Sequence, residues 1–229
     1  IQPPLPKPGA IDCMAVNYME DGTLKEKPRI NGFHKSPAAI IGNGDTMILP
    51  DVPATIFEGE AELGLIIGKI ASNVSESDAM DHVFGYLNFI DGSARGLPPD
   101  RNVFFQVKSR ATFAPIGPFI VTADEIPDPQ NLSVRLWVNG ELKQDFNTND
   151  MAHKIPKAIS WLSSKHPLEP GDIVVGMDGE FRAYLWGNQE CWMNQRICKF
   201  VPNEKINNCF LRNSIAQVPQ TVSYTHLTL

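Results

Sequence analysis

The sequence predicts a β-rich α+β domain with few short helices. Short apolar runs recur between turn residues, and segments of helical character are few. An alternating run at residues 132–138 is followed directly by Asn139-Gly140, which predicts a type I′ hairpin and a returning strand at 142–146. The chain shows no internal repeat and no low-complexity linker, so we expect one main domain.

The remaining elements follow from turn and cap residues in chain order. A short strand at 10–18 leads into a polar loop at 19–28, and a turn at 42–45 precedes a strand at 46–50. Apolar residues predict a strand at 60–70 and another at 83–90. Cap-forming and acidic residues between them predict a helix over 75–82. A turn at 115–118 feeds a strand, helical spacing covers 155–163, and a turn at 169–172 precedes a strand at 173–175.

Composition limits the class of protein and of partner. The 229 residues are 42% hydrophobic and 20% charged, with a net charge of -6, so no basic field favours nucleic acid. No apolar stretch approaches the roughly 18 residues that span a bilayer. The four cysteines include no Cys-x-x-Cys pair, and no His lies at a zinc-finger spacing, so the cysteine pattern predicts no zinc site. We therefore expect a cytoplasmic enzyme or binding protein.

Three carboxylates carry the strongest chemical signal. Glu60 and Glu62 are one residue apart in an apolar strand, so their side chains share one face, and Asp91 ends the next apolar run. Like charges on an apolar face repel each other and lose hydration unless a positive group lies between them. A hard divalent cation such as Mg²⁺ meets that need. The alternatives are a solvated edge strand and pairing with Lys or Arg.

A series of short motifs in a fixed order resembles the fumarylacetoacetate hydrolase family. No single motif suffices, but together they extend from about residue 10 to residue 175. They are Asn17-Tyr18, Phe33-x-Lys35, Glu60-Ala61-Glu62-Leu63, Ile67-Gly68-Lys69, Gly85-Tyr86, Asp91-x-Ser93-Ala94-Arg95, Lys108-Ser109, Pro115-Ile116-Gly117-Pro118, Asn139-Gly140, Gln144-Asp145 and Gly171-Asp172.

The resemblance implies a fold, a metal and a substrate class. The fold is the mixed β-roll, or β-sandwich-like, catalytic domain of the family, usually a homodimer. The metal is Mg²⁺ or Mn²⁺, held by Glu60, Glu62 and Asp91. The substrates are 2-oxo or 1,3-diketo carboxylic acids, as in aromatic-compound catabolism, which are hydrolysed at a C–C bond, decarboxylated or isomerised through a metal-stabilised enolate.

Four further residues match family positions. Lys108 is the expected catalytic cation, with a surface lysine as the alternative. Arg95 is expected either to bind a substrate carboxylate or to brace Asp91. Lys35 is expected in substrate binding or in a structural ion pair, and Gln144 in substrate binding or in support of the site.

The loop after Asn17-Tyr18 departs from the family pattern. Many relatives carry a His there, followed three residues later by a Glu, whereas this chain has Asp21 and Leu24. Glu20, Asp21 or Glu26 could act as the base, with a raised pKa needed near neutrality. The missing imidazole favours isomerisation or decarboxylation over hydrolysis. A catalytically weak or inactive relative is the second hypothesis, and an unrelated β-rich binding module the third.

The end of the chain also departs from the pattern. We expect residues 1–175 to form the catalytic domain, with an incomplete N-terminus because the chain starts without Met. The glycine turn that follows Gly171-Asp172 in relatives is missing, and Ala111 stands where relatives often have Asp. Residues 176–229 are interpreted as an atypical tail produced by a frame shift or a cloning extension.

Overall fold

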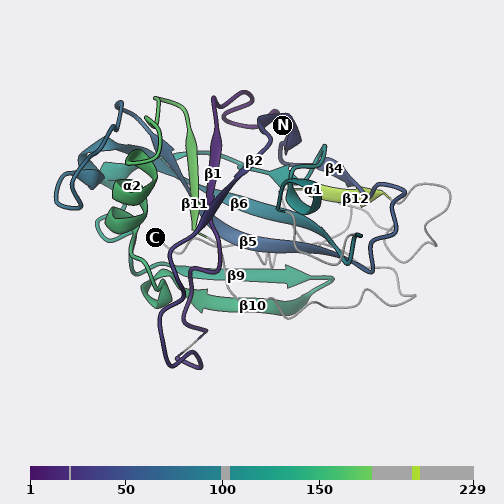
Figure 1. Cartoon of the computed structure of the whole chain (residues 1–229). Helices are drawn as coiled ribbons and strands as arrows, with labels where there is room; N and C mark the ends of the chain where they lie inside the picture. Colours follow the sequence, from purple (N-terminus) through teal and green to yellow (C-terminus); the bar gives the residue numbers. More distant parts are fainter. Residues whose placement is uncertain (21, 99–103, 177–197, 202–229) are drawn as a thin grey trace.

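The computed structural model describes residues 1–20, 22–98, 104–176 and 198–201. Its centre is a six-stranded mixed sheet in the order β2-β1-β11-β5-β6-β8 (Figure 1). Strands β1 and β11 are parallel, and the other neighbours are antiparallel. The strands are β1 (Ile11–Met14), β2 (Gly32–Lys35), β5 (Ile56–Ile67), β6 (Val83–Arg95), β8 (Val121–Thr122) and β11 (Ile173–Gly176).

Three two-stranded sheets surround the central one. Strands β9 (Ser133–Val138) and β10 (Glu141–Asn147) form the expected hairpin, in which Asn139 and Gly140 have φ of 55° and 81°. Positive φ at both turn residues is the property of a type I′ turn, so this prediction is confirmed. The other two sheets pair β4 (Asp45–Ile48) with β12 (Cys198–Val201) and β3 (Ile40–Ile41) with β7 (Ala114–Pro115), both parallel. The predicted β-rich mixed fold is confirmed.

Two α-helices and four 3₁₀ turns complete the described structure. Helix α2 (Ile155–Ser163) has the predicted bounds, whereas the five-residue α1 (Phe104–Lys108) was not predicted. The 3₁₀ turns are η1 (Pro37–Ala39), η2 (Ala79–His82), η3 (Ala123–Glu125) and η4 (Thr148–Asp150). Within the described ranges, no helix has both the length and the apolar character that crossing a membrane requires.

The helix predicted over residues 75–82 is wrong for its first half. Only η2 is helical, and the preceding residues form a turn in which Ser75 Oγ donates to Asp78 Oδ2 at 2.7 Å. Ser75 Oγ also accepts from the backbone amide of Asp78 at 3.3 Å. Short polar side chains that bond locally compete with helix formation, which explains the shorter element.

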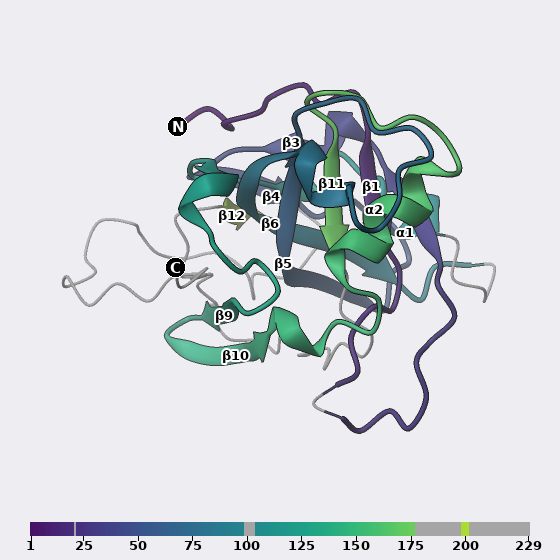
Figure 2. The same ribbon diagram turned by 90° about the vertical axis from the view of Figure 1, so that its left-hand side faces the viewer.

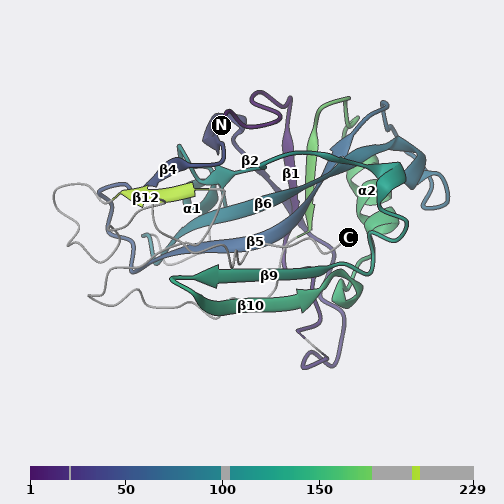
Figure 3. The ribbon, with the colours of Figure 1, turned by 180° about the vertical axis from the view of Figure 1, so that it is seen from behind.

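The two faces of β5 have different neighbours. The apolar side chains of Ala61, Leu63 and Leu65 pack against residues of the β9 strand and of α2. The β9–β10 hairpin lies along β5 and β6, and α2 lies at one end of the sheet, in the views of Figures 1, 2 and 3. Side chains alternate along a strand, so Glu60 and Glu62 point to the opposite face. The expected tail falls outside the described residues, apart from the backbone of β12.

Candidate active site

Glu60 and Asp91 meet across the two longest strands of the central sheet. The antiparallel register of β5 and β6 places Glu60 directly opposite Asp91. Both are buried, with 2% and 0% of their surface exposed. Directly opposed residues of an antiparallel pair have Cβ atoms only about 5 Å apart, so the two carboxylates share one small volume. The solvated edge strand considered from the sequence is therefore wrong.

Two lysines bring positive charge to this pair. Lys108 ends α1, and its Nζ donates to Glu60 Oε2 at 2.8 Å and also to Asp91 Oδ2. Lys35 ends β2, and its Nζ donates to Asp91 Oδ1 and, at 2.8 Å, to the backbone oxygen of Gly92. Lys108 is 3% exposed, so the surface-lysine alternative is wrong. The sequence predicted a positive group beside Glu60 and Glu62, with pairing to Lys or Arg as one alternative; in the structure, Lys108 contacts both Glu60 and Asp91.

Burial and charge set the protonation of these groups. Burial raises the pKa of Glu60 to about 7, against the lowering effect of Lys108. Burial also acts to raise the pKa of Asp91, but Lys108 and Lys35 outweigh it and lower that pKa to about 2. Burial lowers the pKa of Lys35. Burial also acts to lower the pKa of Lys108, but the charges of Asp91 and Glu60 outweigh burial and raise that pKa. Asp91 and Lys108 are thus charged at neutral pH, while Glu60 is close to its midpoint.

Arg95 contacts two glutamates, Glu58 and Glu60, and Glu58 was not among the residues predicted for the site. Its Nε donates to Glu58 Oε2, and a terminal nitrogen of its guanidinium donates to Glu60 Oε1 at 2.7 Å. Glu58 is 5% exposed and lies two residues before Glu60 on β5, hence on the same face. The signal was present, because glutamates occupy every second position from 58 to 62. Arg95 braces Glu60 rather than Asp91 in the contacts that the structure describes.

Gln144 reaches the same strand from the hairpin. Strand β11 pairs with β5 only at residues 64–66, and beyond that pairing Gln144 Oε1 accepts from the Ala61 amide at 2.8 Å. Ala61 lies between Glu60 and Glu62, so Gln144 fixes the backbone that carries both. Its Nε2 is buried and has no hydrogen-bond partner in the described part of the chain. This nitrogen is therefore an unsatisfied donor beside the strand that carries Glu60 and Glu62.

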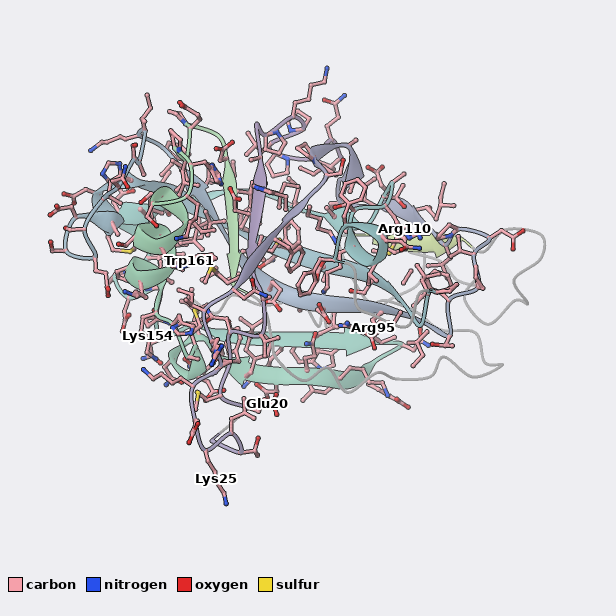
Figure 4. All side chains as sticks on the ribbon, in the orientation of Figure 1. Glu20, Lys25, Arg95, Arg110, Lys154 and Trp161 are labelled. Atoms are coloured by element: carbon pink, nitrogen blue, oxygen red, sulfur yellow. The ribbon has the colours of Figure 1, made fainter. Side chains whose placement is uncertain are left out.

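Two of the loop carboxylates, Glu20 and Glu26, lie on the loop between β1 and β2. Glu20 has a φ of 56° and its Oε2 accepts from Thr23 Oγ1 at 3.3 Å. In Figure 4, Glu20 and Lys25 lie below the β9–β10 hairpin, on the loop that extends past it, whereas Arg95 lies above the hairpin. Glu26 is exposed on the same loop. Asp21 lies outside the described residues.

The buried carboxylates fit a hard divalent cation. Oxygens of Glu60 and Asp91 already converge on one ammonium group, that of Lys108. Glu62, 1% exposed, projects from the same face of β5. An all-oxygen, anionic donor set is what Mg²⁺ and Mn²⁺ prefer. A second group of candidate ligands, Asp12, His34 and His166, has its ligand atoms within 4.8 Å of one another.

Comparisons with known proteins agree with the sequence motifs. The family model described as "Fumarylacetoacetate (FAA) hydrolase C-terminal" matches residues 11–176. Oxaloacetate tautomerase fahd2, mitochondrial, of Xenopus laevis is 38% identical over 177 residues, which are 74% of this chain and 54% of that protein. Oxaloacetate tautomerase YisK of Bacillus subtilis (strain 168) is 37% identical over 179 residues, 75% of this chain and 59% of that protein. The chain therefore spans little more than half the length of these relatives.

Solved structures share the fold. Maleylpyruvate hydrolase from Sphingobium sp. SYK-6, in complex with manganese(II) and pyruvate, superposes with a TM-score of 0.70 at 37% identity, covering 81% of this chain and 66% of that one. The 2-hydroxyhepta-2,4-diene-1,7-dioate isomerase from Mycobacterium marinum superposes with a TM-score of 0.72 at 26% identity, covering 89% of this chain and 78% of that one.

Proposed function

The chain belongs to the fumarylacetoacetate hydrolase family, and on that premise we propose that it is a divalent-metal-dependent isomerase or decarboxylase of small 2-oxo or 1,3-diketo acids. Within this class we propose keto–enol tautomerisation of a 2-oxo diacid such as oxaloacetate as its reaction. The observation that carries the proposal is the buried Glu60–Asp91 pair with Lys108 against both carboxylates. The tautomerase names of the relatives and the missing loop His favour proton transfer over C–C hydrolysis.

Glu60, Glu62 and Asp91 are the proposed ligands of Mg²⁺ or Mn²⁺. When bound, the cation supplies a Lewis acid for the carbonyl oxygen of the substrate. The named relative that holds manganese(II) and pyruvate supports this choice of ion and of ligand class. Arg95 and Lys35 hold Glu60 and Asp91 through the contacts described above, so the donor oxygens are fixed before substrate arrives.

Lys108 is the proposed catalytic cation. Its ammonium group is buried beside the carboxylate pair, where a positive charge acts in a low-dielectric environment. Such a charge stabilises the negative oxygen that develops when the substrate enolises. The Nε2 nitrogen of Gln144, which has no partner among the described residues, is the proposed donor to a substrate oxygen. Arg95 and Lys35 are proposed to act on substrate binding indirectly, by positioning Glu60 and Asp91. Glu20 and Asp21 remain the bases proposed from the sequence, and Glu20 lies on the loop between β1 and β2.

The test follows the ultraviolet absorbance of the enol of oxaloacetate, and the release of CO₂, with and without EDTA. We expect catalysis that EDTA removes and that Mg²⁺ or Mn²⁺ restores. Glu62→Ala removes a proposed ligand and should lower turnover by at least about 100-fold, whereas Glu141→Ala, an exposed glutamate on β10, should not change it. Full activity of Glu62→Ala would contradict the ligand assignment.

A second candidate function is binding without turnover. The departure at Asp21 and Leu24 favours it, because the expected imidazole base is missing. Mg²⁺ and pyruvate binding without tautomerisation, decarboxylation or cleavage of acylpyruvates would support this candidate and refute the first. We also propose a cytoplasmic homodimer; light scattering measures the assembly state, and cell fractionation measures the location.

A further inference from the structure

Asp12, His34 and His166 form a cluster on the other face of the sheet from the proposed active site. Asp12 and His34 are directly opposite each other on β1 and β2. Lys35, the next residue after His34, contacts Asp91, so His34 points away from the carboxylates. His166 comes from the loop between α2 and β11. The cluster therefore joins three segments and is separate from the Glu60–Asp91 site.

The distances suit one coordinated ion. His34 Nδ1 lies 3.0 Å from Asp12 Oδ1, and His166 Nε2 lies 3.2 Å from the same oxygen. In a tetrahedral Zn²⁺ site with bonds of about 2.0–2.1 Å, neighbouring ligand atoms are about 3.3 Å apart. The three ligand atoms all fall within 4.8 Å of one another. The cluster needs only small shifts to surround an ion.

The hydrogen bonds of His166 indicate positive charge between this ring and Asp12. Its Nδ1 lies 2.9 Å from the backbone oxygen of Pro167, which can only accept, so Nδ1 carries a proton. In a neutral ring, Nε2 then presents a lone pair to Asp12 Oδ1, which also offers lone pairs. Only a proton or a metal ion between them makes this contact favourable. A backbone carbonyl that fixes Nδ1–H is a frequent partner of metal-binding histidines.

The carboxylate of Asp12 independently indicates that a positive group binds here. Its side chain is 2% exposed, and its Oδ2 has no hydrogen-bond partner among the residues that the structure describes. An unpaired buried carboxylate oxygen is costly. Nearby Asp172 differs from Asp12, because each of its two oxygens accepts a hydrogen bond, from the amides of Ala10 and Glu169, each at 2.7 Å. The side chains of His34 and His166 are 65% and 33% exposed, so solvent reaches the fourth position.

We propose that Asp12, His34 and His166 form a second metal site, which binds a divalent transition-metal ion of the Zn²⁺ type. Two imidazoles and one carboxylate favour such an ion over Mg²⁺, whereas the carboxylate cluster favours the hard cations. The ion links β1 and β2 to the loop after α2. It stabilises the fold, because it binds a set of ligands that exists only in the folded chain.

The test is a calorimetric titration of the EDTA-treated, dialysed protein with ZnCl₂ in excess Mg²⁺, which occupies the carboxylate site. We expect one Zn²⁺ per chain and a higher unfolding temperature with Zn²⁺. His166→Ala and His34→Ala should each weaken binding by at least about tenfold. His153→Ala is the matched control, because the one bond of His153 Nε2 within the described ranges is to the Pro28 oxygen, at 2.9 Å. Glu60→Gln should also retain Zn²⁺ binding, which separates this site from the proposed active site.

X-ray absorption of the unmodified protein with one equivalent of Zn²⁺ avoids any folding defect of the variants. We expect scattering from two imidazoles and bonds of about 2.0–2.1 Å. Three results would overturn the proposal: no Zn²⁺ binding in excess Mg²⁺, binding unchanged in both histidine variants, or a spectrum without imidazole scattering. If no Zn²⁺ binds, a proton is the positive charge between His166 Nε2 and Asp12 Oδ1.

Discussion

Glu60 on β5 lies directly opposite Asp91 on β6, and the ammonium group of Lys108 contacts both carboxylates. Two buried acids in one volume are stable only when positive charge accompanies them or when one holds a proton. The chain supplies that charge from α1 and β2, on the face of the sheet away from α2. The same requirement makes this position suitable for a divalent cation.

Removing the ammonium group should make the metal-free protein depend on a cation. Lys108→Met leaves the carboxylates without their shared partner, and we expect a loss of about 3–5 kcal/mol in the free energy of unfolding in EDTA. Mg²⁺ should restore part of it, while kcat stays lowered by at least about 100-fold. Urea unfolding with and without Mg²⁺ measures the effect. Lys157→Met removes an exposed pair with Glu76 and should cost less than about 1 kcal/mol; equal losses in the two variants would contradict the argument.

Arg95 is expected to position a metal ligand rather than to bind substrate. Arg95→Gln removes the contacts with Glu58 and Glu60, so the Mg²⁺ concentration for half-maximal activity should rise about tenfold with little change in the substrate KM. Steady-state kinetics at varied Mg²⁺ and varied substrate concentrations separate an effect on the Mg²⁺ dependence from an effect on the substrate KM. Arg135→Gln, which breaks an exposed pair with Asp145, is the control. A higher substrate KM at unchanged Mg²⁺ dependence would instead make Arg95 a substrate ligand.

Cation affinity should depend on pH through Glu60. Burial raises its pKa from 4.5 to about 7 in the metal-free protein. Between these values the folded chain holds a proton that the unfolded chain has released, so the metal-free free energy of unfolding falls as pH rises. The same proton competes with Mg²⁺, whose affinity should rise by up to about tenfold per pH unit below pH 7 and then level off. Calorimetry in buffers of different ionisation enthalpy measures affinity and proton release; a flat profile from about pH 5 to 8 would refute the expectation.

Gly85 should be the less replaceable of two glycines in the central sheet. A Cβ at Gly85 would lie 2.3 Å from the backbone oxygen of Val121 on β8, whereas one at Gly64 would meet the end of the Leu87 side chain at 2.6 Å. The backbone of β8 cannot move without losing its pairing, but Leu87 can change rotamer. We expect Gly85→Ala to cost about 1–3 kcal/mol and Gly64→Ala less. Denaturant midpoints of the two variants measure the losses. A larger loss for Gly64→Ala than for Gly85→Ala would show that the backbone of β8 shifts easily to make room for a Cβ.

Local patterns determined much of the fold and part of the site. A type I′ turn requires positive φ at both central positions, and Asn139 and Gly140 tolerate that conformation, so the dipeptide predicts the hairpin. Helix α2 was readable from its apolar spacing. The structure of the segment at 75–82 could not be predicted in the same way, because Ser75 and Asp78 bond to each other there, and serine and aspartate favour both helix caps and turns. Helix α1 has five residues, too few for a period to show.

The sequence by itself determined that Glu60 and Glu62 share a face and that buried acids need positive charge, because both follow from strand geometry and solvation. Only the tertiary structure decided which groups meet. Strand register set Glu60 against Asp91, α1 brought Lys108 between them, and β1 and β2 placed Asp12 beside His34 with His166 above the same face. These contacts join residues far apart in the chain, and their register depends on the packing of the whole sheet.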